Sequence, residues 1–127
     1  MSKIILVDAW NTFITEEGVF TKMQELLDSF ENRKIILTNA NDEEKLKFGI
    51  VNMPYEVFTL NHNPNKTEPE FYKKMLEFFK LKPEEVIYFE HNEDAVKSAQ
   101  SVGINTHHYD KDKKDLESLR LFLENNL

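Results

Sequence analysis

Four segments of this sequence carry the side chains that could do chemistry, and each of them directly follows or ends an apolar run. They are Asp8 to Thr12, Thr38 to Asn41, Leu60 to Lys66 and Glu90 to Asp94. Together they hold carboxylates, hydroxyls, amides and a lysine, which are groups that act as nucleophiles, transfer protons or bind anions. Each residue alone also has a plain structural interpretation, because an aspartate such as Asp8 is common at a turn after a strand. The case for a site therefore depends on whether the fold brings the four segments together.

Buried strands are predicted ahead of all four segments. Four runs are almost continuously apolar, which is typical of strands covered on both faces of a parallel sheet. A fifth run, Asn105 to Tyr109, is more polar and is expected at an edge of the sheet. The four apolar runs are Lys3 to Asp8, Lys34 to Thr38, Glu56 to Leu60 and Glu85 to Phe89.

Between these runs the spacing of the apolar residues becomes that of helices. Thr67 and Glu70 have capping-box spacing ahead of one such pattern, and Gly103 is placed to end another. The periodic faces are Met23 to Phe30, Phe71 to Phe79, Ala95 to Val102 and Leu116 to Leu123.

Alternating strands and helices predict an α/β fold, a three-layer Rossmann-like parallel sheet of about five strands with helices on both faces. Ligands of such sheets bind outside the carboxyl ends of the strands, near the point where the strand order reverses. The four polar segments are therefore expected to converge at that edge.

The composition excludes several classes of protein. A chain of 127 residues is expected to form one domain, residues 1–127, and without cysteine it has no disulfide, thiolate metal site or cysteine nucleophile. The formal net charge of −7 disfavours binding to nucleic acid. No apolar run approaches the roughly 20 residues that span a bilayer, and the start of the chain lacks the apolar stretch of a secretory signal. We therefore expect a cytoplasmic protein that binds neither membranes nor nucleic acid.

The order of the motifs resembles that of the haloacid dehalogenase (HAD) superfamily over nearly the whole chain. The resemblance rests on Asp8 to Thr12 after the first strand, Thr38-Asn39 at the end of the second, Lys66 ahead of a helix, and the acidic and amide cluster from Glu90. It extends through Leu81 to Tyr88 before the last motif and Ala99 to Ile104 after it.

The resemblance implies a role for each matched residue. Asp8 would attack phosphorus, or carbon in the dehalogenases, as a covalent nucleophile. Thr38 would donate a hydrogen bond to the transferring group, and Lys66 would stabilise both Asp8 and the developing negative charge. The positions implied to bind the substrate are Trp10, Asn11, Thr12, Asn39 and Asn92.

Trp10 departs from the phosphatase pattern. Phosphatases of the superfamily carry an aspartate at this position, which protonates the leaving group and later activates water. An indole cannot exchange protons at neutral pH, so a rate deficit of roughly 10²- to 10⁴-fold is expected. Dehalogenases have an aromatic residue there, because a halide leaves without a proton. In either case we expect Trp10 to pack under the segment Phe13 to Phe20.

The fourth motif departs from the pattern of metal-dependent members. The resemblance places Asp8 and Glu90 as ligands of Mg²⁺ and puts His91 at the position that usually binds the metal. Imidazole is a poor ligand for this hard cation, so the Mg²⁺ site is weakened unless Asp94 also reaches it. Alternatively, His91 is a loop histidine paired with Glu90 or solvent.

The intervals from Thr12 to Thr38 and from Thr38 to Lys66 are too short for a cap domain. An open site of this kind suits a phosphorylated macromolecule or a protein partner better than a small acid that must be sealed from water. Three functions remain open. They are a weak or specialised phosphohydrolase, a catalytically degenerate binding or regulatory module, and, less favoured, metal-independent displacement at carbon.

Overall fold

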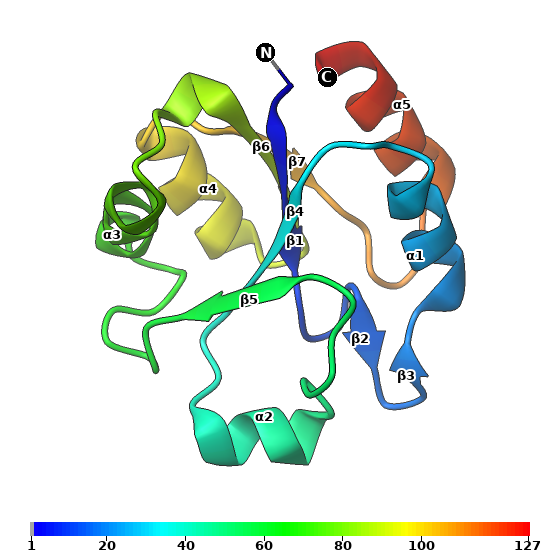
Figure 1. Ribbon diagram of the computed structural model, residues 1–127, viewed down its shortest axis with the longest axis horizontal. Helices are drawn as coiled ribbons and strands as arrows, with labels where there is room; N and C mark the ends of the chain where they lie inside the picture. The colour runs from blue at the N-terminus through cyan, green and yellow to red at the C-terminus, as the bar shows by residue number, and fades with distance from the viewer. Residues whose placement is uncertain (1) are drawn as a thin grey trace.

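A parallel sheet of five strands forms the centre of the molecule in the computed structural model, which describes residues 2–127 (Figure 1). The sheet has the order β5-β4-β1-β6-β7, so the first strand of the chain lies in the middle. Each neighbouring pair is parallel. The strands are β1 (Ile4–Asp8), β4 (Lys34–Thr38), β5 (Glu56–Thr59), β6 (Val86–Glu90) and β7 (Asn105–His108).

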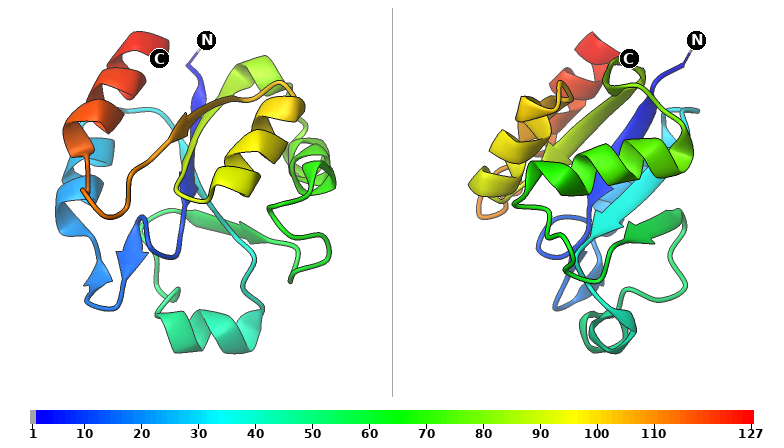
Figure 2. Two further views of the ribbon diagram at one scale, coloured as in Figure 1. Left: turned by 180° about the vertical axis from the view of Figure 1, so that it is seen from behind. Right: turned by 90° about the vertical axis from the view of Figure 1, so that its left-hand side faces the viewer.

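Two helices cover each face of the sheet, as Figure 2 shows. The helices α1 (Thr21–Asp28) and α5 (Leu116–Asn126) pack on one face, and α3 (Pro69–Phe79) and α4 (Glu93–Ser101) pack on the other. The residues of β1 alternate between the two cores, with Val7 in one and Leu6 in the other, as the period of two in a strand requires. The predicted three-layer α/β architecture is confirmed.

Short elements complete the connections. A small hairpin of β2 (Ile14–Thr15) and β3 (Gly18–Val19) follows β1, and the 3₁₀ helix η1 (Pro83–Glu85) precedes β6. Gly103 has a φ of 95° and follows α4, which confirms the predicted helix end. The predicted capping box at Thr67 was wrong. The N-cap of α3 is Glu68, without a side-chain cap bond, and a proline begins the helix because its ring already holds a helical φ.

The helix α2 (Asp42–Phe48) lies beyond the carboxyl end of the sheet and joins neither helical layer (Figure 1). None of its residues is buried, since its sequence DEEKLKF has no apolar stripe wide enough to cover a sheet face. A capping box between Asn41 and Glu44 begins it, and Gly49 with a φ of 74° ends it. Phe48 contacts the ring of Trp10, with centroids 4.7 Å apart. The segment between β4 and β5 therefore covers the edge of the sheet where the polar segments end.

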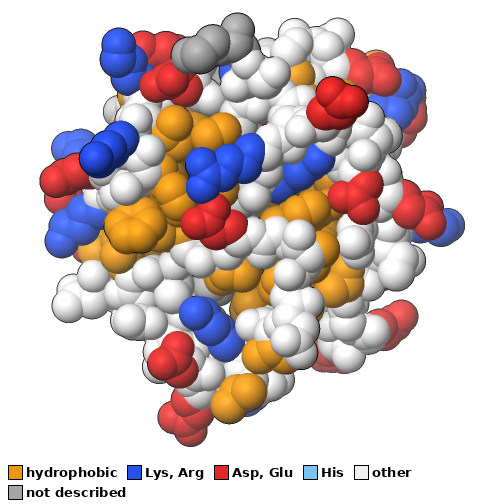
Figure 3. Space-filling model, in the orientation of Figure 1, with side chains coloured by type: hydrophobic (Ala, Val, Ile, Leu, Met, Phe, Trp, Pro, Cys, Tyr) orange, Lys and Arg blue, Asp and Glu red, His pale blue; other side chains and the backbone are white. Residues whose placement is uncertain are grey.

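The edge strand β5 carries an aromatic cluster on its α3 side. Phe58 contacts both Phe78 and Phe79, and Arg33 lies over the ring of Phe79. Figure 3 shows hydrophobic side chains gathered beside α3 and β5. The ion pair between Arg33 and Glu56 places charges at this edge, which discourages pairing with another strand. Within residues 2–127, no helix combines the length and the apolar character that crossing a membrane requires.

Replacing one buried and one exposed leucine tests how much the central sheet and α2 each contribute to the stability of the fold. We expect Leu6→Ala to lower the free energy of unfolding by about 2–5 kcal/mol, because Leu6 is fully buried at the centre of β1. The same change at Leu46, which is 73% exposed on α2, should alter it by less than about 0.5 kcal/mol. Urea denaturation measures both values. Equal losses would contradict the placement of α2 outside the core.

Candidate active site

A cavity of about 200 Å³ lies at the carboxyl edge of the sheet and is lined in part by α2. All four polar segments contribute to it, so the predicted convergence is confirmed. The register explains why, because Asp8 is paired with Leu37 of β4 and Val7 with Phe89 of β6. The strands β1, β4 and β6 therefore end side by side. The lining residues are Asp8, Trp10, Thr38, Asn39, Ala40, Glu44, Phe48, His62, Lys66, Thr67, Glu90, His91, Asn92 and Ala95.

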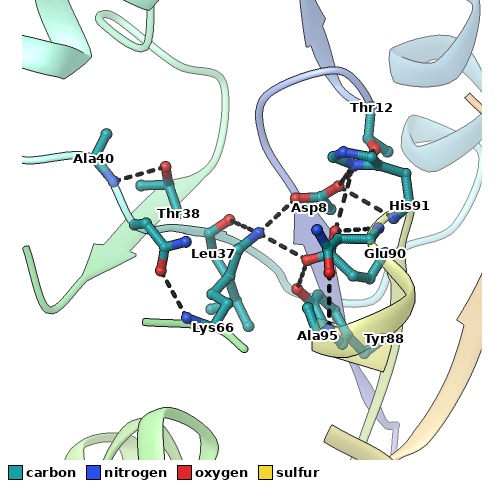
Figure 4. Close-up of polar contacts among 12 residues, drawn as sticks. Asp8, Thr12, Leu37, Thr38, Ala40, Lys66, Tyr88, Glu90, His91 and Ala95 are labelled. Atoms are coloured by element: carbon teal, nitrogen blue, oxygen red, sulfur yellow. Dashed lines mark hydrogen bonds and ion pairs between the residues drawn. The ribbon is translucent and has the colours of Figure 1, made fainter. Parts of the chain in front are cut away.

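Asp8 is the centre of the polar network drawn in Figure 4, and it is 1% exposed. Its Oδ1 accepts a hydrogen bond from the ammonium of Lys66 at 2.5 Å. Its Oδ2 accepts one from the hydroxyl of Thr12 at 2.6 Å. The same oxygen is 2.5 Å from Nδ1 of His91 and 3.3 Å from the backbone nitrogen of His91. Both oxygens of this buried carboxylate therefore have charged or polar partners.

Glu90, at the end of β6, is fully buried beside Asp8. Its Oε1 accepts hydrogen bonds from Lys66 Nζ at 2.8 Å and from the hydroxyl of Tyr88 at 2.5 Å. Its Oε2 accepts one from the backbone N–H of Asn92 at 3.0 Å and lies 3.3 Å from Nδ1 of His91. All four carboxylate oxygens of the pair are therefore engaged by protein groups.

The pKa values of the two carboxyl groups are shifted in opposite directions because their partners differ. Burial favours the neutral form of Asp8, but the charge of Lys66 and the hydrogen bond from His91 outweigh it and lower the pKa of Asp8. Burial, and then the neighbouring charge of Asp8, raise the pKa of Glu90. Burial opposes the charged forms of Lys66 and His91, yet their carboxylate partners raise both pKa values. The partners of Asp8 therefore favour its ionised form, whereas the surroundings of Glu90 favour its neutral form.

Three lining residues use one side-chain atom to order the backbone of the site. Oγ1 of Thr38 accepts from the N–H of Ala40 at 3.1 Å, and Oδ1 of Asn39 accepts from the N–H of Lys66 at 2.7 Å. Oδ1 of Asn92 caps α4 by accepting from Ala95 at 3.0 Å. These bonds leave the hydroxyl hydrogen of Thr38 and the amide NH₂ groups of both asparagines to donate to a ligand.

Two residues implied to bind the substrate are placed elsewhere. Asn11 has a φ of 65° in the turn after β1 and does not line the cavity. Thr12 is buried, and its hydroxyl contacts Asp8 and His91 instead of the cavity. Thr12 therefore holds the candidate nucleophile, and Asn11 shapes the turn that carries Thr12.

Sequence reasoning missed four residues of the site. Glu44 and Phe48 come from α2. His62 lies within the expected segment Leu60 to Lys66 but was assigned no role there, and its Nε2 is 2.6 Å from Oε1 of Glu44. No local pattern signals these contacts, because they depend on where α2 lies. Tyr88 could have been found, since residues two apart on a strand share a face and Glu90 was already a candidate.

Asp8, Glu90 and His91 each offer one atom within 4.8 Å of the others, so the cluster has the composition of a candidate cation site. The donor set, however, does not fit Mg²⁺ as it stands. This cation requires six oxygen ligands in near-ideal octahedral geometry, whereas every carboxylate oxygen here already has a protein partner and the third ligand is an imidazole. Asp94 is exposed on α4 and does not line the cavity.

Comparisons with known proteins identify the fold. No family model matches the chain, and no curated protein matches it. A HAD family enzyme from Bacteroides thetaiotaomicron, an aspartate-to-alanine variant in complex with magnesium and inorganic phosphate, superposes with a TM-score of 0.67 and 17% identity. The match covers 85% of this chain and 94% of that one. This chain has a HAD-like fold.

Two further solved structures share the HAD-like fold at similar coverage. The core domain of a Streptococcus pneumoniae protein assigned as a phosphoglycolate phosphatase gives a TM-score of 0.59 at 16% identity, over 86% of this chain and 80% of that one. An uncharacterised protein from Corynebacterium glutamicum gives 0.59 at 14% identity, over 96% of each chain. Identities this low establish the fold and leave the activity to the residues of the site.

Removing the cation at the centre of the network should be costly. We expect Lys66→Met to lower the free energy of unfolding by about 3–5 kcal/mol at pH 7, because it leaves two carboxyl groups buried without their shared ammonium. In an Asp8→Asn background the same change should cost less, since one negative charge is already gone. Denaturant unfolding of the four proteins measures this coupling. As a control, Lys97→Met should change stability little, because the pair of Lys97 with Glu93 is exposed. Strictly additive losses would contradict the shared network.

The raised pKa of His91 predicts a dependence of stability on pH. A raised folded-state pKa gives a stabilisation that is complete below the unfolded value, about 6.5, and is lost as the pH rises through the folded value. The difference in melting temperature between the wild type and His91→Gln should therefore be largest near pH 6 and should shrink toward pH 9. Thermal unfolding at constant ionic strength measures it. A difference that grows with pH would show that His91 is held in its neutral form.

Proposed function

We propose that this chain is a slow phosphohydrolase that uses Asp8 as its nucleophile and works without Mg²⁺. The observation that supports it most strongly is the asymmetry of the Asp8 carboxylate. Thr12 and His91 hold Oδ2, whereas Oδ1 accepts a hydrogen bond from Lys66 alone among residues 2–127. Oδ1 therefore keeps lone-pair density for attack on phosphorus, and the carboxylate is ionised.

The cavity also supplies donors for a phosphoryl group. The ammonium of Lys66 lies beside the attacking oxygen, and the hydroxyl of Thr38 and the amide of Asn39 line the same cavity. Donors of this kind stabilise the negative charge that develops during phosphoryl transfer. They would hold a phosphorylated substrate locally, against the net charge of −7 on the whole chain.

The proposal needs no metal because the chain balances its own carboxylates. Lys66 and His91 contact Asp8 and Glu90 at distances from 2.5 to 3.3 Å. The ammonium of Lys66 and the ring of His91 beside the two carboxyl groups weaken the negative potential that would repel a phosphate.

The rate should be low because the acid/base group is missing. Trp10 lines the cavity and packs against Phe48, and its indole cannot protonate a leaving group or activate water. General acid–base catalysis contributes about 10²- to 10⁴-fold, so this much of the usual rate is absent.

A second candidate is a binding or regulatory module in the cytoplasm that holds a phosphorylated ligand or a protein partner in the same pocket. One observation favours it. Every oxygen of Asp8 and Glu90 has a partner, so the network is complete and stable without turnover. Catalysis and simple binding therefore have to be separated by experiment.

Turnover of 4-nitrophenyl phosphate tests the proposal, because its leaving group needs little protonation. We expect slow release of nitrophenol at the same rate in excess Mg²⁺ and in EDTA, and none above the blank for Asp8→Asn. The control Asp94→Asn removes an exposed carboxylate outside the cavity and should keep the full rate. Loss of activity in EDTA would contradict metal independence, and activity in Asp8→Asn would contradict the nucleophile. Phosphate binding by calorimetry without any turnover would support the binding module.

A further inference from the structure

We propose that α2 is a movable cover for the cavity, and that the contact between Glu44 and His62 is the latch that selects ligands by size. The inference rests on the proposed function only for the phosphate that the cavity holds. It assigns the choice of ligand to two residues of the cavity wall that lie outside the hydrogen-bond network of Asp8.

The helix α2 is anchored at both ends, and none of its own residues is buried. Before the helix, the N–H of Ala40 donates to Oγ1 of Thr38 at 3.1 Å, and its carbonyl accepts from the hydroxyl of Thr59 at 2.8 Å. After the helix, Ile50 belongs to the core and is 3% exposed. Gly49, with a φ of 74°, joins the helix to Ile50. The segment between the two anchors can therefore move without opening the core.

Two side-chain contacts hold α2 against the rest of the cavity wall. Near the start of the helix, Oε1 of Glu44 is 2.6 Å from Nε2 of His62. At its end, the rings of Phe48 and Trp10 have centroids 4.7 Å apart. All four residues line the cavity. Separating these contacts would therefore open the wall that α2 supplies.

The latch joins this helix to a loop that is fixed. Nδ1 of His62 is 2.9 Å from Oδ1 of Asn65, and the next residue, Lys66, is buried in the Asp8 network. The side chains of Glu44 and His62 are 30% and 44% exposed. Exposed ion pairs contribute little to stability, because water solvates both partners. The latch therefore holds α2 in place but opens readily.

The closed cavity limits the size of the ligand. Its volume of about 200 Å³ equals that of roughly seven water molecules in the liquid, which accommodates a phosphate ion and a few more atoms. A phosphoserine within a peptide carries main chain on both sides, which exceeds this volume and requires α2 to move. Binding to a state that is only partly populated is weakened by that fraction. The latch should therefore weaken the binding of a phosphopeptide and leave that of inorganic phosphate unaffected.

The fluorescence of Trp10, the sole tryptophan of the chain, reports on the cover without any ligand. Glu44→Gln removes the charge that faces His62 but keeps an oxygen for the capping box, so the start of the helix is preserved. We expect acrylamide to quench Trp10 more strongly in Glu44→Gln and in His62→Gln than in the wild type, with no additional increase in the double variant. The control Glu43→Gln, an adjacent exposed glutamate that does not line the cavity, should match the wild type. Equal quenching in all of these proteins would overturn the cover.

Calorimetry with inorganic phosphate and with a short peptide centred on phosphoserine tests the selection by size. In both Glu44→Gln and His62→Gln, the ratio of the affinity for the peptide to the affinity for phosphate should rise by about two- to fivefold. Only the first variant removes a negative charge, so a rise shared by both is due to the latch. A ratio that stays at the wild-type value would overturn the selection.

Failure of the cover and failure of the proposed function give different results. Phosphate binding with unchanged quenching would overturn the cover and leave the proposed function standing. If neither probe binds to the wild type or to the variants, the proposed function and the selection of ligands both fail. Stronger quenching in the two latch variants would then still show that α2 is held by Glu44 and His62.

Discussion

The ammonium of Lys66 lies between the carboxyl groups of Asp8 and Glu90, 2.5 and 2.8 Å from their oxygens, and the rest of the site depends on this contact. Two carboxyl groups buried this closely would repel each other and lose most of their hydration, so one of them would bind a proton. The shared cation allows Asp8 to remain ionised. It also fixes the end of β1 against the end of β6, because the two acids belong to these neighbouring strands.

The backbone around Lys66 is built to hold it there. Asn39, at the end of β4, accepts the backbone N–H of Lys66 at 2.7 Å, and the carbonyl of Leu37 accepts from its ammonium at 3.3 Å. The hydroxyl of Ser98 on α4 donates to the carbonyl of Thr67, the next residue. Lys66 is consequently tied to β4 and α4 as well as to both acids.

Trp10 shows how one residue links packing and chemistry. Its contact with Phe48 ties α2 to the loop after β1, so α2 covers the carboxyl edge of the sheet. The same ring lines the cavity, so the HAD-like fold accommodates an indole beside Asp8 at this edge of the sheet. His91 contacts Asp8 with an imidazole, which suits Mg²⁺ poorly as a ligand.

The sequence alone determined the five-stranded parallel sheet, the helices on its faces and the convergence of Asp8, Thr38, Asn39, Lys66 and the Glu90 to Asn92 segment. Continuous apolar runs and helical periodicity are local signals, and parallel strands bring their carboxyl ends to one edge. Only the tertiary structure decided which atoms of that edge meet. His91 pairs with Asp8, and α2 brings Glu44 and Phe48 to the cavity, although these residues are far apart in the chain. Thr12 turns inward to Asp8 because of the geometry of the loop after β1. Such contacts depend on which of many side chains reach the same buried charges. The spacing of residues along the chain does not indicate which of them will do so.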